Sequence, residues 1–385
     1  MNTLLTVLIS VLVFGFLIFI HELGHYLFAR LFKVTIIEFS IGMGPRLLWY
    51  DSKKTGIRYT LAMIPIGGFV SMAGEDGVTD EGEDATVPVL GNPDVPRERT
   101  DELPPRQSVK DDPNAFCKKP AWQRYIITAA GAAVNIIAGF LAMLVLVGIT
   151  DVGGTEVGKF ATDEMFANMG DVDLTHRSEA QGLMLGDVIT HVNGKSVVLA
   201  DELSYMIMRF GNEPVDITLL REGETVELED VVFPTANQQG QTFGVMDFQV
   251  YAVRKSFGNF FSLGLRKTVL VIRMCWESII DLIRGRYSLS AVSGPVGISG
   301  AIGDAARAGV ASLLNIAVII SINLGFMNLL PIPALDGGRL LTIFIEMVTR
   351  KKLPPKVEGM INGIGLILLL GLSVIIMVKD VIALF

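Results

Sequence analysis

Four long apolar runs divide the chain and decide the solvent in which it folds. A bilayer core of about 30 Å is crossed by roughly 20 apolar residues in a helix. Runs of this kind lie within residues 1–34, 119–150, 310–340 and 357–385. Mean hydropathy is +0.50 and only 19% of the residues are charged, a balance that is rare in water-soluble proteins. The sequence therefore predicts a polytopic α-helical membrane protein with four transmembrane helices.

The first run resembles a signal peptide only in its apolarity. It has no basic start and no small-residue cleavage site, so we expect it to be retained. Four spans place both termini on one side of the membrane. Lysine and arginine gather in the two loops that follow the first and third runs, which predicts that these loops are cytoplasmic in a bacterial inner membrane. Both termini and the segment 151–309 are then expected in the periplasm.

The loop after the first run has two parts of different character. Residues 35–74 include β-prone, weakly charged sequence from Gly56 to Met72, which predicts a membrane-associated β-hairpin, with an ordinary amphipathic loop as the alternative. Residues 75–118 are acidic and rich in proline, so this cytoplasmic loop is expected to be disordered. A shorter cytoplasmic loop is predicted for residues 341–356.

The segment 151–250 is soluble in character, with short β-like runs interrupted by glycine and asparagine. The stretch from Ser178 to Gly194 ends in an Asn-Gly hairpin signal and looks like the core of a bacterial PDZ domain. One such α+β domain fits the length. PDZ domains bind extended peptides or C-termini by strand addition, but a spacer without a ligand, or a filter that excludes bulky substrates, fits the same sequence.

Residues 251–309 are predicted to form an amphipathic helix followed by a Gly-rich loop. The helix, from about Val253 to Arg286, carries charges at roughly helical spacing and is expected to lie on the membrane surface. A fifth span is the competing interpretation. Five charges within its central part disfavour that span.

The first apolar helix contains a motif that suits metal chemistry. His21 and His25 are four residues apart, so both imidazoles project from one helix face, and Glu22 lies beside them. In an apolar helix, each bare ionisable group costs at least about 2.5 kcal/mol unless it is paired or bound to a metal. Hydrogen-bonded structural histidines are the simpler alternative. The two cysteines are far apart and offer no thiolate site, so any metal must use His, Asp or Glu.

A third ligand is expected from an acidic residue in another apolar segment. The remaining histidines, His176 and His191, lie in the soluble segment. Asp336 is the strongest candidate, because Pro331 and Pro333 should unwind the third helix just before it. The weaker candidates are Glu346 and Asp380.

Together these motifs resemble the site-2 protease family. The resemblance is carried by His21-Glu22-Leu23-Gly24-His25 in the first span and by the run from Asn328 to Gly338 in the third. Further matches are Gly131 with Asn135, the run from Gly67 to Val70, and the run from Ser293 to Gly297. The single interposed PDZ segment is similar to that of the RseP-like bacterial branch, whose best-known members carry two.

The resemblance implies roles for individual residues. His21, His25 and Asp336 would hold one Zn²⁺ ion, and Glu22 would be the general base. The substrate-binding residues would be Asn328, Pro331, Pro333, Gly67, Gly68 and Phe69, with the β element pairing with an unwound substrate helix.

The function expected from these residues is that of an intramembrane zinc metalloendopeptidase. It would act in regulated intramembrane proteolysis on single-pass, pre-trimmed membrane proteins, such as anti-sigma factors or signal-peptide remnants. The lipid bilayer and a peptide at the PDZ domain are the other expected partners. A nucleic acid is not expected as a partner. The alternatives are an inactive PDZ-bearing scaffold, a membrane zinc transporter and a metal-dependent hydrolase acting on lipid.

Overall fold

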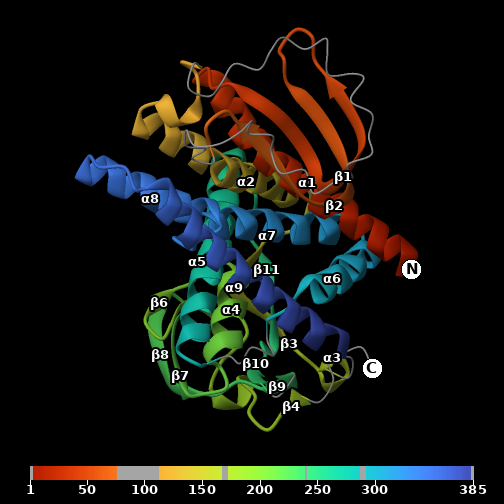
Figure 1. Ribbon diagram of the computed structural model, residues 1–385. Helices are drawn as coiled ribbons and strands as arrows, with labels where there is room; N and C mark the ends of the chain where they lie inside the picture. The colour runs from red at the N-terminus through yellow and green to blue at the C-terminus, as the bar shows by residue number, and fades with distance from the viewer. Residues whose placement is uncertain (1–2, 76–111, 167–171, 239–240, 287–291, 383–385) are drawn as a thin grey trace. The chain divides into compact units, whose positions relative to one another are not determined.

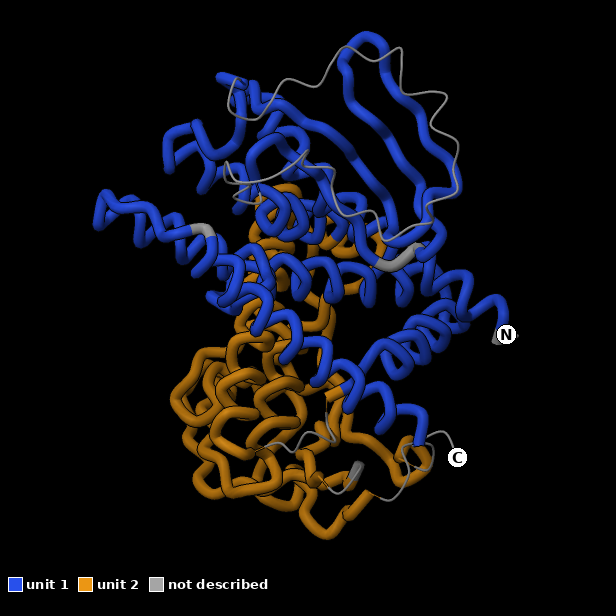
Figure 2. Tube along the Cα trace, in the orientation of Figure 1, with its two compact units in different colours: residues 1–142, 293–385 blue, residues 143–292 orange. Residues whose placement is uncertain are grey.

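The computed structural model describes residues 3–75, 112–166, 172–238, 241–286 and 292–382. Most of the acidic segment that the sequence predicts to be disordered lies outside these ranges. The chain divides into two compact units, one made of residues 1–142 and 293–385 and the other of residues 143–292 (Figure 2).

Four described helices are long and apolar enough to cross a membrane. They are α1 (Thr3–Leu31), α2 (Ala121–Ile149), α7 (Val310–Leu329) and α9 (Pro355–Ile382) (Figure 1). At 1.5 Å per residue, even the 20-residue α7 spans about 30 Å, the thickness of a bilayer core. The prediction of a polytopic α-helical membrane protein is confirmed at this level.

Helices α2 and α7 pack closely because small residues face each other. A Cβ atom on Gly325 would lie 2.6 Å from the carbonyl oxygen of Ala132, and one on Gly139 would lie 2.6 Å from Cγ1 of Ile322. The hydroxyl of Ser321 donates to the carbonyl oxygen of Asn135 at 2.9 Å. Glycines that allow such close approach are the usual means of association between helices in lipid.

The third apolar run is two helices and not one. Helix α7 ends at Leu329, Leu330 is extended, and α8 (Asp336–Thr349) begins at the predicted third ligand. Two predictions need correction. The span expected over 310–340 is interrupted between α7 and α8, and much of the loop expected over 341–356 is helical.

The turn between α7 and α8 depends on its small residues. A Cβ atom on Gly337 would lie 1.8 Å from the carbonyl oxygen of Leu330, and Ala334 has a positive φ of 71°. Helix α9 supports this turn, because Gly365 packs against Pro333 and the side-chain oxygen of Asn362 accepts from the backbone N–H of Ala334 at 3.4 Å.

Strands β1 (Ile36–Asp51) and β2 (Arg58–Met72) form the β element beside α1 (Figure 1). Both strands bend, so their halves pair in the order 46–51, 58–62, 36–41 and 68–72. Gly42 and Gly44 have φ values of 87° and 86° at the bend of β1, a conformation that favours glycine. We call these two bent strands the four-row sheet.

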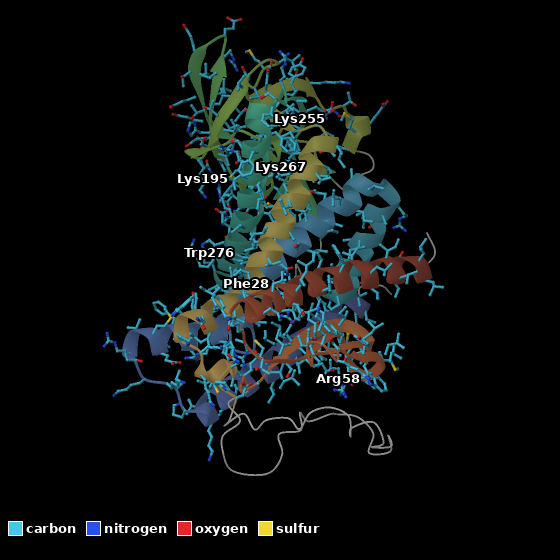
Figure 3. All side chains as sticks on the ribbon, turned by 90° about the horizontal axis from the view of Figure 1, so that it is seen from above. Phe28, Arg58, Lys195, Lys255, Lys267 and Trp276 are labelled. Carbon is cyan, nitrogen blue, oxygen red and sulfur yellow. The ribbon has the colours of Figure 1, made fainter. Side chains whose placement is uncertain are left out.

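A buried ion pair fixes the bend of β1. Glu38 is 5% exposed and receives bonds from Arg46 at 3.1 and 2.9 Å and from the hydroxyl of Thr60 at 2.5 Å. A second pair joins Arg58, labelled in Figure 3, to Asp51 at 2.6 and 3.0 Å. The sheet thus pairs these charges, and Glu38 is their buried member.

Helix α6 (Pro295–Ala308) occupies most of the described stretch that the sequence predicts to be a Gly-rich loop, so that prediction is wrong. Its first backbone N–H groups are capped from α9, since Asp380 accepts from Gly294 and Gly297 at 2.8 and 3.0 Å. Both glycines are needed, because a Cβ atom on either would lie within 3.3 Å of the Asp380 carboxylate. Further along, Gly303 packs against Thr6 of α1.

The second unit is a mixed α and β structure around its own core. Its main sheet has the order β11-β3-β5-β7-β8 with β6 added to β5, and a smaller sheet has the order β10-β9-β4. Helix α4 (Ala200–Phe210) contributes Leu203, Met206 and Ile207 to the core. The strands are β3 (Gly153–Phe160), β4 (Val172–Asp173), β5 (Val188–Val192), β6 (Lys195–Ser196), β7 (Val215–Arg221), β8 (Glu224–Val231), β9 (Thr235–Gln238), β10 (Gln241–Gly244) and β11 (Phe248–Ala252), and the remaining short helix is α3 (Asp163–Phe166).

Helix α5 (Phe257–Ile283) lies where the sequence predicts an amphipathic helix. Within the second unit it is held to α4 by charged side chains. Arg266 bonds to Glu202 at 2.7 Å, and Lys267, labelled in Figure 3, pairs with Asp201 at 2.8 Å.

Candidate metal centre

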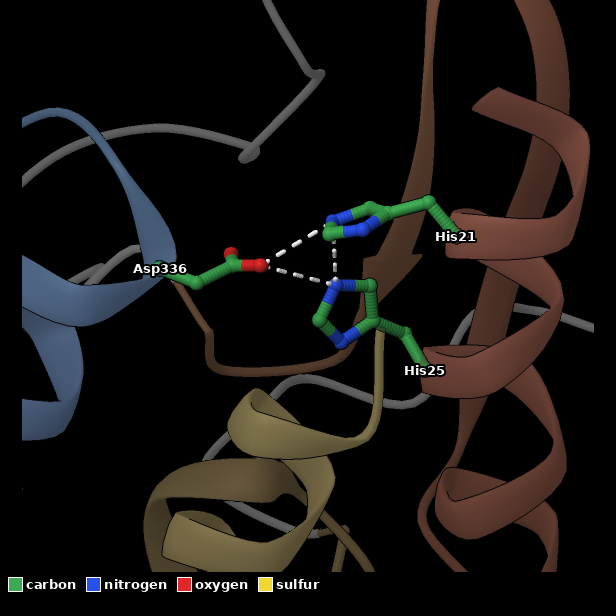
Figure 4. Close-up of side chains that lie close together, drawn as sticks. All are labelled: His21, His25 and Asp336. Carbon is green, nitrogen blue, oxygen red and sulfur yellow. Dashed lines mark hydrogen bonds and ion pairs between the residues drawn. The ribbon is translucent and has the colours of Figure 1, made fainter. Parts of the chain in front are cut away.

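His21 and His25 point from α1 toward the same space, as their spacing predicts (Figure 4). Their residues are 7% and 8% exposed, and their Nε2 atoms are 3.2 Å apart. Two imidazole nitrogens at this distance inside a protein need a shared proton or a shared cation.

Asp336 completes the cluster from the first residue of α8 (Figure 4). Its Oδ2 atom lies 3.0 Å from Nε2 of His21 and 3.3 Å from Nε2 of His25. The segments meet because α7 ends just before the proline turn, which brings the start of α8 to α1. Among the described residues, these three form the one group of His, Cys, Asp or Glu with ligand atoms close enough to hold a metal ion.

The spacing of the three donor atoms fits zinc. Zinc binds imidazole nitrogen and carboxylate oxygen at about 2.0–2.2 Å in tetrahedral sites, so neighbouring donors should be about 3.3–3.6 Å apart. The observed separations of 3.0, 3.2 and 3.3 Å are close to this edge length. Oδ2 of Asp336 is buried without a hydrogen bond, which suits an atom reserved for a cation. Three protein donors leave a fourth position for water or substrate.

The ring of His25 is oriented by α2. Its Nδ1 atom donates to the carbonyl oxygen of Ile127 at 2.9 Å, which leaves Nε2 of the neutral ring free to bind a metal. Gly131 provides the space, because a Cβ atom there would lie 2.3 Å from Nε2 of His25.

Asn135 plays the corresponding part for His21. The residue is fully buried, its Nδ2 atom lies 3.4 Å from Nδ1 of His21, and its Oδ1 atom has no hydrogen-bond partner. A half-turn of the amide places Oδ1 against Nδ1. The amide would then accept the Nδ1 proton and leave Nε2 of His21 free, the usual arrangement for a metal-bound histidine.

Glu22 lies between the metal face of α1 and the four-row sheet. A Cβ atom on Gly68 would be 3.0 Å from Cγ of Glu22, so the glycine lets the strand pass directly beside the carboxylate. In the part of the chain that the structure describes, residues 68–72 pair only with residues 36–41. Their other edge is therefore available to another extended segment.

The remaining predicted site residues fall into two groups. Gly67 and Phe69 flank Gly68 on the open edge strand, and Asn328 lies in the last turn of α7. Pro331 and Pro333 form the turn that precedes Asp336. That these five residues contact the substrate stays a prediction.

The two weaker ligand candidates lie elsewhere. Glu346 pairs with Arg124 at 2.6 Å, and Asp380 caps α6. Both carboxylates are occupied by structural contacts, so Asp336 is the acidic member of the cluster.

An ion pair between Glu75 and Arg339 was not expected from the sequence. Arg339 lies in the first turn of α8, and Glu75 follows β2 and also accepts from the backbone N–H of Met72 at 3.2 Å. The pair therefore joins the helix that carries Asp336 to the strand that passes Glu22. Asn135 was noted only as part of a family match, and a polar residue in an apolar helix is the signal that could have assigned it to the site.

The fold and the site define a membrane protein with a candidate metal site between its helices. Comparison with known proteins gives the same class, since residues 9–372 match the family model described as Peptidase family M50. The chain belongs to this family, the site-2 proteases.

Curated relatives match over nearly their full length. The chain is 30% identical to the regulator of sigma-W protease RasP of Bacillus subtilis over 431 residues, which covers 99% of each protein. It is 31% identical to the zinc metalloprotease RasP of Geobacillus kaustophilus over 430 residues, covering 99% of the chain and 98% of the relative. Among the functions considered above, these matches select the zinc metalloprotease.

Proposed function

We propose that His21, His25 and Asp336 hold the zinc ion of this metalloprotease and that Glu22 is its general base. The observation that carries the proposal is the convergence of three ligand atoms within 4.8 Å of one another from two helices, α1 and α8. Glu22 is one residue from the first ligand and beside an open strand edge, which is where a scissile peptide bond has to lie.

Each residue has a defined task in peptide hydrolysis. Zinc held by His21, His25 and Asp336 would supply Lewis acidity for polarising the scissile carbonyl and for lowering the pKa of a water molecule. Glu22 accepts a proton from the attacking water and returns it to the leaving amine nitrogen. Ile127 and Asn135 hold the two imidazoles in the tautomers that present Nε2.

The substrate is bound as an extended segment on the edge formed by residues 68–72. A peptide bond in a regular transmembrane helix is shielded by its own hydrogen bonds, so the helix must unwind before it is cut. Strand addition to the open edge replaces those hydrogen bonds. Asn328, Pro331 and Pro333 bound the opposite side of the substrate path.

The orientation, the PDZ domain and the substrate class form the wider proposal. The termini and residues 151–250 are periplasmic, and the active site lies toward the cytoplasmic leaflet of the inner membrane. The second unit contains a PDZ domain that binds a peptide or excludes substrates with intact outer domains. The substrates are pre-trimmed single-pass membrane proteins, such as anti-sigma factors or signal-peptide remnants. The name of the Bacillus subtilis relative, regulator of sigma-W protease, links that relative to a sigma factor.

The decisive experiment is Glu22→Gln in the full chain, with zinc content and cleavage of a membrane substrate measured together. We expect one zinc per chain and at least a 100-fold loss of cleavage, the lower range for removal of a general base. Glu358→Gln, in another apolar helix, is the control and should cleave normally. Unchanged cleavage by Glu22→Gln would refute the assignment.

Removal of residues 153–250 tests whether the PDZ domain excludes substrates that still carry their outer domains. Cleavage of full-length substrates should rise while cleavage of pre-trimmed substrates stays constant. If the ratio of the two rates is the same as in the intact chain, the second unit is not a size filter.

A further inference from the structure

An apolar pocket lies between α1 and the four-row sheet. Its volume is about 530 Å³, and its lining includes Phe19, Leu23 and Tyr26 from α1. Leu48, Tyr59 and Leu61 line the sheet side. We call this space the sheet pocket.

The pocket exists because α1 covers only part of the sheet. Phe39 packs edge-on against Phe19 and Tyr26, with ring centroids 6.0 and 5.4 Å apart, and is only 6% exposed. On the outer rows, in contrast, Leu48 is 67% exposed and Leu61 is 43% exposed. The outer rows therefore leave an apolar recess beside α1.

The sheet pocket is distinct from the metal centre. At 100° per residue, Phe19, Leu23 and Tyr26 form one stripe of α1, and His21 and His25 project from a different face. Glu22 lies between the two faces, and Gly68 of the edge strand 68–72 passes beside it. With rows about 4.8 Å apart, residues 58–62 are about 10 Å and residues 46–51 about 14 Å from the strand 68–72, and no residue of that strand lines the pocket. The pocket therefore opens on another face of α1 than the one that carries His21 and His25, and Phe39 and Ile41 of the row 36–41 lie between the pocket and the edge strand.

The surroundings of the pocket are those of a membrane interface. Its α1 residues lie within the apolar span Leu4–Leu31. Trp49 and Tyr50, on the outermost row, are 52% and 66% exposed. Exposed tryptophan and tyrosine concentrate where the acyl region meets the headgroups. Water has no favourable place in an apolar recess at this depth, whereas acyl chains are abundant there.

One end of the pocket offers polar and cationic groups. The hydroxyls of Tyr26 and Tyr59 are 2.9 Å apart, and the guanidinium carbon of Arg30 lies 6.0 Å from the centre of the Tyr26 ring. Arg30 is exposed, one helical turn beyond Tyr26. An apolar recess that ends beside a cation matches an anionic phospholipid, with its acyl chain inside and its phosphate at the arginine.

We propose that the sheet pocket binds one acyl chain of an anionic phospholipid, whose phosphate contacts Arg30. The bound lipid fills the recess under the outer rows and supports the sheet beside the active site. The proposal does not depend on zinc or on Glu22, so it can fail or succeed separately from the proposed function.

Photocrosslinking in lipid nanodiscs tests the proposal. The probe is phosphatidylglycerol with a diazirine in the middle of one acyl chain, and labelled peptides are identified by mass spectrometry. We expect labelling of peptides from α1 and the outer rows, and at least a fivefold loss in Leu61→Trp, which fills the recess. Met63→Trp is the matched control, because Met63 is 59% exposed on the same strand and is not part of the pocket lining. Thermal melting of both variants checks their folding.

A second comparison tests the headgroup. Phosphatidylglycerol should label the pocket at least threefold more than phosphatidylcholine carrying the same chain, and Arg30→Gln should remove this preference. The labelling should be the same in Glu22→Gln. Equal labelling of Leu61→Trp and Met63→Trp would overturn the proposal, as would displacement of the lipid probe by a substrate transmembrane peptide, which would assign the pocket to substrate.

Discussion

A Cβ atom on Gly131 would lie 2.3 Å from Nε2 of His25, so α2 can approach the imidazole this closely only because residue 131 is glycine. We expect Gly131→Ala to push the imidazole away and lower zinc affinity at least tenfold, because small displacements of a ligand have large effects. Zinc competition with a fluorescent chelator measures this. Gly148→Ala in the same helix is the control, since its Cβ atom would be 3.7 Å from the nearest neighbour. Equal zinc affinity in the two variants would show that the close approach of α2 to His25 does not affect zinc binding.

Two substitutions of Asn135 distinguish its role as a hydrogen-bond acceptor for His21 from its role in packing. Asn135→Leu removes the acceptor for Nδ1 of His21 and should lower zinc affinity by about 10- to 100-fold, the usual effect of losing the partner of a ligand. Asn135→Asp keeps an acceptor and should retain affinity. The measurement is zinc dissociation from the purified protein, before any assay of cleavage. A loss of the same size in both variants would mean that packing and not tautomer control explains Asn135.

The pair between Glu75 and Arg339 should position Asp336 relative to the edge strand. Glu75→Gln and Arg339→Gln are each expected to lower kcat severalfold, and the double variant should be no worse than either one, since paired charges are not additive. The exchange Glu75→Arg with Arg339→Glu should recover part of the rate. Steady-state kinetics with a membrane substrate checks this, and fully additive losses would contradict the positioning role.

The cap on α6 gives a stability prediction. Asp380→Ala removes the acceptor for two backbone N–H groups and should destabilise the protein by about 0.5–2 kcal/mol, the range for a lost helix cap. Asp304→Ala is the control, because Asp304 lies on α6, the helix that Asp380 caps, and its side chain is 71% exposed. Melting in detergent should show a lower midpoint for Asp380→Ala alone.

Glu277 should make the second unit sensitive to acid. Burial raises the pKa of this carboxyl, but hydrogen bonds from Tyr205 and Arg273 and the charge of Arg209 outweigh it, so the pKa is lowered. A lowered pKa in the folded state gives stability that is present above the unfolded pKa, near 4.5, and is lost as the pH falls through the folded value. The melting temperature should therefore decrease below about pH 4.5, and Glu277→Gln should weaken that decrease. An unchanged pH profile would exclude the carboxyl as its source.

The sequence predicted those parts of the structure that depend on local spacing. Apolar runs of sufficient length specify membrane helices, because every backbone group in lipid must be hydrogen-bonded within its own segment. The four-residue spacing of His21 and His25 places both rings on one face because an α-helix has 3.6 residues per turn. Pro331 and Pro333 end α7 because proline cannot continue the hydrogen bonds of a helix interior. The β-prone residues before Met72 likewise indicated strands.

Other features were decided by tertiary packing. Four rows from two strands, α8 in place of a loop, and α6 in place of a Gly-rich loop all depend on contacts with distant segments. Helix α6 begins where it does because Asp380 of another helix accepts its first N–H groups, and local composition contains no sign of that partner.

The sequence by itself determined a membrane protein with two histidines and a glutamate on one helix. Only the tertiary structure decided that Oδ2 of Asp336 lies 3.0 and 3.3 Å from the two imidazoles, while Glu346 and Asp380 are used elsewhere. The physical reason is the difference between local and long-range order. Spacing along one helix follows from its own hydrogen bonds, but the meeting of α1, α2 and α8 depends on which small residues let them approach.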